Sequence, residues 1–202
     1  MDRRAERARA AAPSKLGPVW AGVVLLSLLA AGIPAATADE GVWALLRGGG
    51  QVILLRHTRT TPGAGDPPGM RLDDCGSQRN LSEAGREHAR RIGDAFRARA
   101  IPVDRVLSSP WCRCLDTARL AFGAAEVWQP LGNLYGRAHA AGEQLPGLRA
   151  VVGEPRAGGN LVLVSHGSTI AALTGVMPAP GEMVVLTPRG GGRFAVAGRL
   201  TD

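Results

Sequence analysis

The sequence predicts an α/β protein, a three-layer α/β/α sandwich with a mainly parallel central sheet. Short apolar runs occur at residues 51–55, 103–108 and 161–165, and segments with apolar residues at helical spacing separate them. Strands that alternate with helices form a mainly parallel sheet with both faces covered. The 202 residues, 45% hydrophobic and 20% charged, suit one domain and exclude a long disordered chain.

Residues 1–38 are predicted to be a signal peptide, followed by the folded domain over residues 39–202. A basic start precedes an uncharged stretch, and Ala36-Thr37-Ala38 supplies the small residues of a cleavage site. The alternative is an uncleaved membrane anchor, but the dense apolar part, residues 19–31, is shorter than the ~20 residues that span a bilayer. We therefore expect an exported protein, periplasmic or secreted, with no stable membrane insertion after cleavage.

The positive charge is carried almost wholly by arginine, since Lys15 is the one lysine among 24 basic residues. The net charge is +7; five basic and two acidic residues lie before Asp39, which leaves +4 for the rest. Arginine forks suit phosphate or carboxylate. The arginines are scattered and aromatic residues do not alternate with them, so nucleic-acid binding is excluded as a function.

The first half of the domain contains two strands and two helices. Three glycines precede the strand at residues 51–55, and a helix begins at Ser82 and stops before Pro102. A second strand spans residues 103–108, and Pro110 opens a helix that runs to about Phe122. The apolar face of the first helix is predicted to hold Leu81, Ala84, His88, Ala89, Ile92, Ala95 and Phe96.

The second half contains the clearest buried strand, residues 161–165, followed by a helix over 167–174. Before that strand we expect a weak strand at 127–128 and a helix over 142–152. The chain ends in a hairpin that turns at residues 189–192, with strands at 183–187 and 194–197.

Three strand ends carry histidine or arginine. Arg56 and His57 follow the first strand, Arg113 lies in the first helical turn after the second strand, and His166 follows the clearest strand. Ligands bind beyond the carboxyl ends of parallel strands. Each of these residues alone is ordinarily structural, but together they are expected to meet at one crevice.

This set of side chains suits phosphoryl transfer without a metal or another cofactor. The transition state spreads negative charge over three equatorial oxygens, and two guanidinium forks can bind those oxygens bidentately. A neutral imidazole can attack phosphorus and form a phosphohistidine, while a second histidine donates a hydrogen bond. Helix amino termini after Ser108 and His166 add N–H donors.

The motifs around these residues resemble those of the histidine phosphatase superfamily, which shares its fold with phosphoglycerate mutase. Residues 56–58, R-H-T, are similar to the R-H-G motif, and residues 108–118 are similar to the S-S-P-x-x-R-x-x-x-T-A segment. Residues 164–167 resemble the motif that contains the second histidine. Residues 80–85 match the L-[ST]-x-x-G motif at the start of a helix. The resemblance covers nearly all of residues 51–175. It implies His57 as the nucleophile, with Arg56, Arg113 and His166 binding phosphate.

Two positions depart from the family pattern. Thr58 replaces the usual glycine, and its hydroxyl is a candidate donor to the ligand. Asn133 stands in the segment where the common branch has a glutamate, and an amide cannot protonate a leaving alkoxide. Either the leaving group needs little help, as in relatives that act on phosphohistidine, or another carboxylate serves as proton donor, the candidates being Asp66, Asp73, Asp74, Glu126 and Glu143.

The three cysteines suggest one disulfide in an exported protein. Cys75 is expected to pair with Cys112 or Cys114, because neighbours two apart on a helix point away from each other. A zinc site from Cys112, Cys114 and histidines is a sharper alternative, but this spacing is wrong for ordinary structural zinc. Arg59 and Arg79 are candidates for a third anion contact, and Arg59 is assigned, with Thr58, to the substrate pocket.

The sequence thus predicts an exported, metal-independent phosphatase that hydrolyses a phosphomonoester through a covalent intermediate on His57. Its partner would be a phosphorylated small molecule or an envelope component. A phosphate-ligand binding protein that has lost catalysis, a mutase and a phosphohistidine-protein phosphatase are the alternatives. The sequence indicates neither the physiological substrate nor the oligomeric state.

Overall fold

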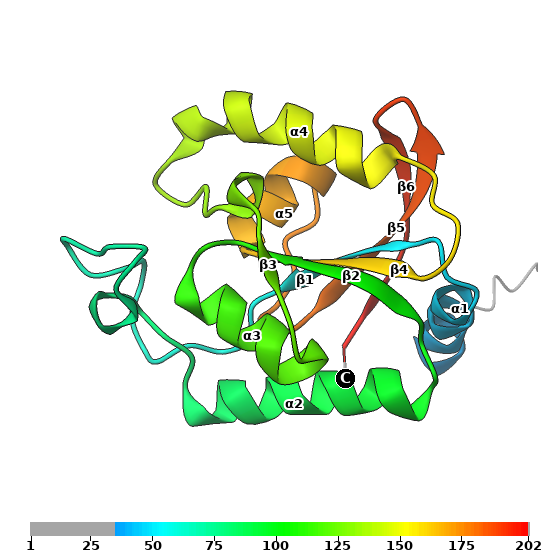
Figure 1. The fold of residues 1–202 in the computed structure, drawn as a ribbon, viewed down its shortest axis with the longest axis horizontal. Coiled ribbons are helices and arrows are strands. Elements are labelled where there is room, and N and C mark those ends of the chain that lie inside the picture. The colour runs from blue at the N-terminus through cyan, green and yellow to red at the C-terminus, as the bar shows by residue number, and fades with distance from the viewer. Residues whose placement is uncertain (1–34, 202) are drawn as a thin grey trace, which may run out of the picture. The chain divides into compact units, whose positions relative to one another are not determined.

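A six-stranded sheet separates two layers of helices (Figure 1). The computed structural model describes residues 35–201. The strand order is β3-β2-β4-β1-β5-β6; the first four are parallel, and the last two form an antiparallel hairpin at one edge. The strands are β1 (Val52–Arg56), β2 (Val103–Ser108), β3 (Glu126–Val127), β4 (Asn160–Ser165), β5 (Met183–Gly190) and β6 (Arg193–Leu200).

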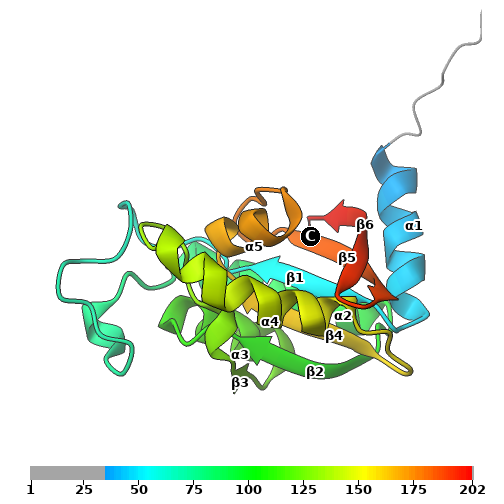
Figure 2. The same ribbon diagram turned by 90° about the horizontal axis from the view of Figure 1, so that it is seen from above.

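Each face of the sheet has its own apolar cluster, because alternate residues of a strand point to opposite faces. On β1, Ile53 and Leu55 pack in the cluster that includes the first three helices, while Val52 and Leu54 pack in the cluster of the last two. Figures 1 and 2 show these layers on either side of the sheet. The helices are α1 (Ala35–Arg47), α2 (Glu83–Ala98), α3 (Cys112–Phe122), α4 (Ala141–Gly153) and α5 (Gly167–Thr174).

The predicted fold class is confirmed. The bounds of β2 and α5 agree with the predicted ranges, and β5 and β6 form the expected hairpin. Helix α3 begins at Cys112, two residues after Pro110, and three single turns of 3₁₀ helix were not predicted. These are Cys75–Ser77, Gln129–Leu131 and Ala138–Ala140.

The buried face of α2 differs from the predicted one at its glycines. Ala89, Ile92 and Phe96 are buried as expected, and Ser82 is the N-cap, its hydroxyl accepting a hydrogen bond from the Gly85 N–H. Ala84 is exposed and His88 is partly exposed, whereas Gly85 and Gly93 are buried. A Cβ on Gly85 would collide with the carbonyl of Arg59, and one on Gly93 with that of Ala121. The glycines are therefore buried because backbone packs directly on the helix.

Helix α1 was not predicted, and it packs beside β6 (Figure 2). Its buried side chains are Val42, Trp43 and Leu46, and the Trp43 ring meets Phe96 edge-on at 5.5 Å between centroids. The predicted signal peptide lies mostly outside the described residues, apart from Ala35–Ala38. Among the described helices, none has the length and apolar character needed to cross a bilayer.

Candidate active site

The carboxyl ends of β1, β2 and β4 lie side by side. Arg56 is in register with Ser165, and Ser108 with Val164. The His57 N–H donates to the Ser165 carbonyl at 3.0 Å, which brings the chain after β1 next to the chain after β4. Side chains that follow these three strands must therefore share one edge of the sheet, as the spacing of the motifs predicted.

A cavity of about 320 Å³ at this edge is lined by all four of the principal predicted residues, Arg56, His57, Arg113 and His166. The two imidazole rings lie 5.3 Å apart between centroids, at 69° to each other. The rest of the lining is small or polar, with one methionine: Gly63, Ala64, Gly65, Arg79, Asn133, Tyr135, Gly167, Ser168 and Met177.

His57 is buried, and its Nδ1 lies 2.9 Å from the carbonyl oxygen of Thr58. Because a carbonyl only accepts, Nδ1 carries the proton in this contact and Nε2 keeps its lone pair. Burial, together with the positive charges of Arg113, Arg56 and Arg79, lowers the pKa of His57 to about 3. The ring is therefore neutral at ordinary pH, with one nitrogen available to attack an electrophile.

His166 is enclosed by α3 and the segment before it. Its Nε2 lies 2.8 Å from the Ser109 hydroxyl and 3.5 Å from the Cys114 sulfur, and the Trp111 ring packs edge-on against it. Its Nδ1 lies 3.5 Å from Nη2 of Arg113. Burial lowers the pKa of His166 well below its usual range, and the neighbouring His57 and arginines add to this.

Arg56 and Arg113 are held differently. Nη1 of Arg56 donates to the Pro178 carbonyl at 2.7 Å, and its Nε is buried without a partner. The Arg113 side chain is only 1% exposed, and its two terminal nitrogens donate to the two carboxylate oxygens of Asp66, at 2.5 and 3.1 Å. The fork expected to bind phosphate thus already holds a carboxylate.

Asp66 is the one candidate proton donor that contacts the residues of the cavity. It also accepts hydrogen bonds from the Trp111 ring N–H and the Arg79 backbone N–H. The contacts with Arg113 lower its pKa despite burial, which opposes that change. Of the other candidates, Asp73 pairs with Arg71, Asp74 caps a 3₁₀ turn, Glu126 pairs with Arg105, and Glu143 lines a separate cavity of about 320 Å³.

Asn133 lies in the wall of the cavity, at the position where the family that the motifs resemble commonly has a glutamate. Its Oδ1 accepts hydrogen bonds from the Ser168 hydroxyl at 2.8 Å and from the Tyr135 N–H at 3.1 Å. The amide therefore ties the loop before α4 to the start of α5. No aspartate or glutamate lines this cavity in the described part of the chain.

Thr58 and Arg59, which are predicted to belong to the substrate pocket, are not among the residues that line this cavity. Thr58 is fully buried, and its hydroxyl lies 3.4 Å from that of Thr117 on α3. Arg59 is exposed, and its carbonyl packs on the start of α2. Arg79, the other candidate for a third anion contact, does line the cavity. The exposed His139 lies in a 3₁₀ turn and is not part of the lining.

The disulfide joins Cys75 to Cys112, which decides between the two predicted pairings. Cys114 is a buried free thiol whose pKa is raised by burial to about 12. With Cys112 in a disulfide, the zinc alternative built on Cys112 and Cys114 is wrong. Across residues 35–201, no three His, Cys, Asp or Glu side chains are placed to hold a metal ion.

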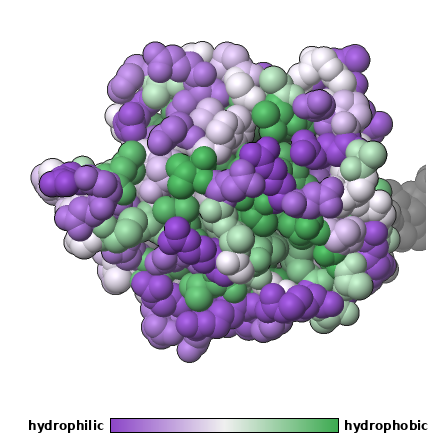
Figure 3. Space-filling model, in the orientation of Figure 1, coloured by the Kyte–Doolittle hydropathy of each residue, from purple (hydrophilic) through white to green (hydrophobic). Residues whose placement is uncertain are grey.

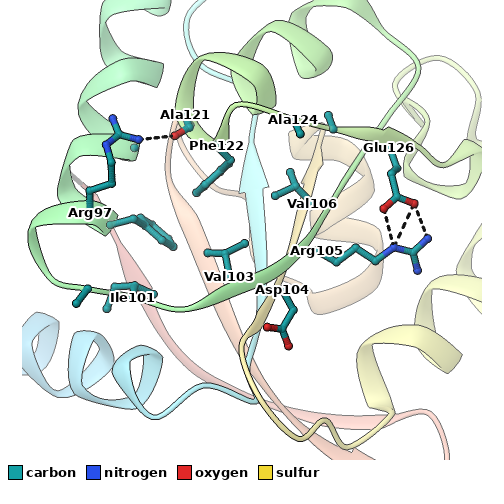
Figure 4. A pocket seen from close by; sticks show the side chains of 14 residues that line it. Arg97, Ile101, Val103, Asp104, Arg105, Val106, Ala121, Phe122, Ala124 and Glu126 are labelled. Carbon is teal, nitrogen blue, oxygen red and sulfur yellow. Dashed lines mark hydrogen bonds and ion pairs between the residues drawn. The ribbon is translucent and has the colours of Figure 1, made fainter.

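A larger cavity, of about 590 Å³, lies between α2, α3 and the edge of the sheet, and of the predicted site residues it contains only the candidate proton donor Glu126 among the residues described (Figure 4). Its charged side chains are largely paired: Arg105 with Glu126, and Arg97 with Asp94 and the Ala121 carbonyl. On the face in Figure 3, hydrophobic residues gather near the centre between hydrophilic borders. Its lining has two carboxylates, Asp104 and Glu126, but no histidine, cysteine or serine among the residues that the structure describes.

The histidine phosphatase superfamily (branch 1) model matches residues 52–134, which include the first histidine motif and the arginine motif. Over these residues the chain is similar to that superfamily. Its fold resembles SixA from Agrobacterium tumefaciens, named as a phosphohistidine phosphatase, with 27% identity over 76% of this chain and 98% of that one, and a TM-score of 0.50.

Two more distant structures share the superfamily fold. The protein histidine phosphatase SixA in complex with tungstate is 20% identical over 75% of this chain and 96% of that one, with a TM-score of 0.54. A phosphoserine phosphatase from Entamoeba histolytica, in complex with 3-phosphoglyceric acid, is 14% identical over 75% and 97%, with a TM-score of 0.56. Among curated proteins, none matches the chain.

Proposed function

We propose that this protein is an exported phosphatase that hydrolyses a phosphomonoester through a covalent phosphohistidine on His57. The observation that carries the proposal is the state of the His57 ring. Its Nδ1 proton is directed to the Thr58 carbonyl, the ring is neutral because it is buried beside three arginines, and it lies in the same cavity as Arg56, Arg113 and His166.

In the first step, the lone pair on Nε2 of His57 attacks phosphorus, an N–P bond forms, and the P–O bond to the leaving group breaks with its electron pair going to oxygen. In the second step, water attacks phosphorus, the N–P bond breaks, and phosphate leaves the regenerated imidazole. Arg56, Arg113 and His166 bind the equatorial oxygens in both steps. Gly167 and Ser168, the first residues of α5, add the positive end of a helix at the cavity wall.

The ring proton of His166 is directed to its hydroxyl neighbour. A guanidinium only donates, so the contact with Nη2 of Arg113 makes Nδ1 of His166 the acceptor and places the proton of the neutral ring on Nε2. That proton is donated to the Ser109 hydroxyl oxygen at 2.8 Å. Donation from Nδ1 to a phosphate oxygen therefore requires that Arg113 turns to the phosphate and that Nδ1 takes up a proton.

The leaving oxygen takes its proton from water, since none of the described residues that line the cavity is a carboxylate and Asp66 is held by Arg113. This arrangement favours leaving groups that are stable once expelled. A phosphohistidine-protein phosphatase is the second candidate function, because Asn133 replaces an acid and the 27% identical SixA is named for that activity. Phosphorylated histidine peptides tested beside phosphoserine and phenyl phosphate would identify the substrate class.

Export is supported by the composition of residues 1–38 and by the Cys75–Cys112 disulfide, a bond that persists in oxidising compartments. A cut before Asp39 would remove the first four residues of α1, while its buried side chains, Val42, Trp43 and Leu46, would remain. Amino-terminal sequencing of protein recovered from outside the cytoplasm should begin at Asp39.

The experiment that tests catalysis compares the wild type with His57→Ala. Turnover of phenyl phosphate should be abolished in the variant and unaffected by a chelator, and brief incubation of the wild type should trap an acid-labile phosphoenzyme. His139→Ala, at an exposed histidine outside the cavity, is the matched control and should keep full activity. Full activity of His57→Ala would refute the mechanism, and phosphate binding without hydrolysis by the wild type would favour a non-catalytic binding protein.

A further inference from the structure

Arg79 is a third arginine of the active-site cavity that the phosphoryl-transfer mechanism does not use. It lies in the segment between β1 and α2 and lines the cavity with Arg56 and Arg113. Arg59, a second arginine of the same segment, is exposed and lies outside the lining. The fold therefore brings Arg79, but not Arg59, to the cavity.

The Arg79 guanidinium is oriented but not neutralised. Its Nη1 donates to the Thr60 hydroxyl and to the Gly63 carbonyl, each at 2.8 Å, while its Nε is buried without a partner. The Arg79 side chain forms no salt bridge with any carboxylate described in residues 35–201. Asp66 accepts a hydrogen bond from the backbone N–H of Arg79, but its carboxylate is paired with the side chain of Arg113. A buried donor on an uncompensated cation is a position that an anionic ligand would satisfy.

The Arg79 side chain is bonded to the loop at residues 63–65, which lines the same cavity. Its side chain is bonded to the loop at Gly63, and the next glycine of that loop, Gly65, approaches the ring of Tyr135, which is 65% exposed. The two histidines, in contrast, are buried at the ends of β1 and β4. A group that contacts Arg79 would thus lie beyond the phosphate bound at His57 and His166.

We propose that the substrate carries a second anionic group, a carboxylate or a second phosphate, close to the phosphate that is removed, and that Arg79 binds it. This inference rests on the proposed function, because it takes the pocket at His57 to be the phosphate site. Arg79 is then a specificity-determining residue, and the preferred substrates are phosphorylated acids or bisphosphates. A monophosphate of a neutral alcohol would leave the Arg79 Nε unpartnered.

The test uses phosphonates, which cannot be hydrolysed at their P–C bond, and measures binding by calorimetry in the presence of a chelator. Methylphosphonate carries one anionic group, phosphonoacetate adds a carboxylate, and methylenediphosphonate adds a second phosphonate. Wild-type protein should bind at least one of the latter two about tenfold or more tightly than methylphosphonate, as expected for a charge-assisted hydrogen bond. The ligand with the larger gain identifies which anion the site prefers.

Arg79→Gln should remove this preference, while the variant should still bind methylphosphonate, which also shows that the cavity remains folded. Arg59→Gln removes the same charge outside the cavity and should keep the preference. The inference is overturned if wild-type protein shows no preference, if Arg79→Gln retains it, or if Arg79→Gln weakens all three ligands equally, since Arg79 would then bind the transferred phosphoryl group. Failure of wild-type protein to bind any phosphonate would instead contradict the phosphate site itself.

Discussion

Removing the Cys75–Cys112 disulfide should strongly lower the stability of the domain. The two cysteines are 37 residues apart in the sequence, and the chain-entropy relation gives about 4 kcal/mol for closing a loop of that length in the unfolded chain. For a domain of this size, 1 kcal/mol corresponds to about 2–4 °C in Tm. The double variant Cys75→Ser/Cys112→Ser should therefore melt about 8–16 °C below the wild type.

Differential scanning calorimetry of the wild type, the double variant and the wild type in reducing buffer measures this effect. The reduced wild type should melt close to the double variant, because both lack the same covalent link. Cys114→Ala keeps the disulfide and serves as a control for loss of a cysteine side chain. A Tm of the double variant within 2 °C of the wild type would refute the reasoning, and it would mean that the loop is equally constrained without the bond.

Two further predictions concern the buried charges of the site. Asp66→Ala leaves the Arg113 guanidinium buried without a carboxylate and should destabilise the protein by about 3–5 kcal/mol; saturating phosphate should raise the Tm of this variant more than that of the wild type, and an equal rise would contradict the pairing. The pKa of His57 is lowered to about 3 in the folded protein, whereas an unfolded histidine titrates near 6.5. Below pH 6.5 the unfolded chain therefore binds a proton that the folded chain does not, so the free energy of unfolding falls as the pH falls. At pH 5 this residue alone should lower it by about 2 kcal/mol. Urea unfolding at pH 7 and pH 5 gives the free energy of unfolding at each pH. His57→Asn should reduce the difference between these two free energies by that amount, whereas His139→Asn should not change it. An unchanged difference in His57→Asn would show that the pKa of His57 is not lowered.

The convergence of the four principal site residues could be predicted because two independent rules apply to the same positions. Local hydrophobic runs locate β1, β2 and β4, and the geometry of parallel strands then brings their carboxyl ends together. The side chains that follow each strand, such as His57 and His166, share a cavity for that reason. No information about distant contacts was needed.

Helix α1 is absent from the sequence prediction although its amphipathic pattern is present in the sequence. Val42, Trp43 and Leu46 are spaced as one face of a helix, and all three are buried. The helix overlaps the predicted cleavage site, and no element is predicted for it from the sequence. Amphipathic spacing alone would have been sufficient to find it.

The partner of Arg113 could not be predicted, because the contact joins residues 47 apart through a segment without periodicity. Asp66 lies among glycines and prolines, where no hydrophobic pattern sets the direction of a side chain. The same applies to Arg59 and Arg79: both are arginines of one irregular segment, and only the path of the chain decides that one lines the cavity. Sequence motifs predicted which residues share the cavity but not their partners in this structure.

The irregular segment before α2 and the phosphate site are parts of one structural unit. Residues 71–76 are all exposed, so apolar burial cannot hold this segment in place (Figure 1). Three polar or covalent links do so instead: Asp66 to Trp111 and Arg113, Gln78 to the Cys112 N–H at 2.9 Å, and the disulfide. All three end on residues 111–113, the start of α3, which also carries the fork of Arg113 and packs on His166. A change that loosens the segment should therefore also displace the groups that are proposed to bind phosphate, and reduction of the disulfide is expected to impair stability and turnover together.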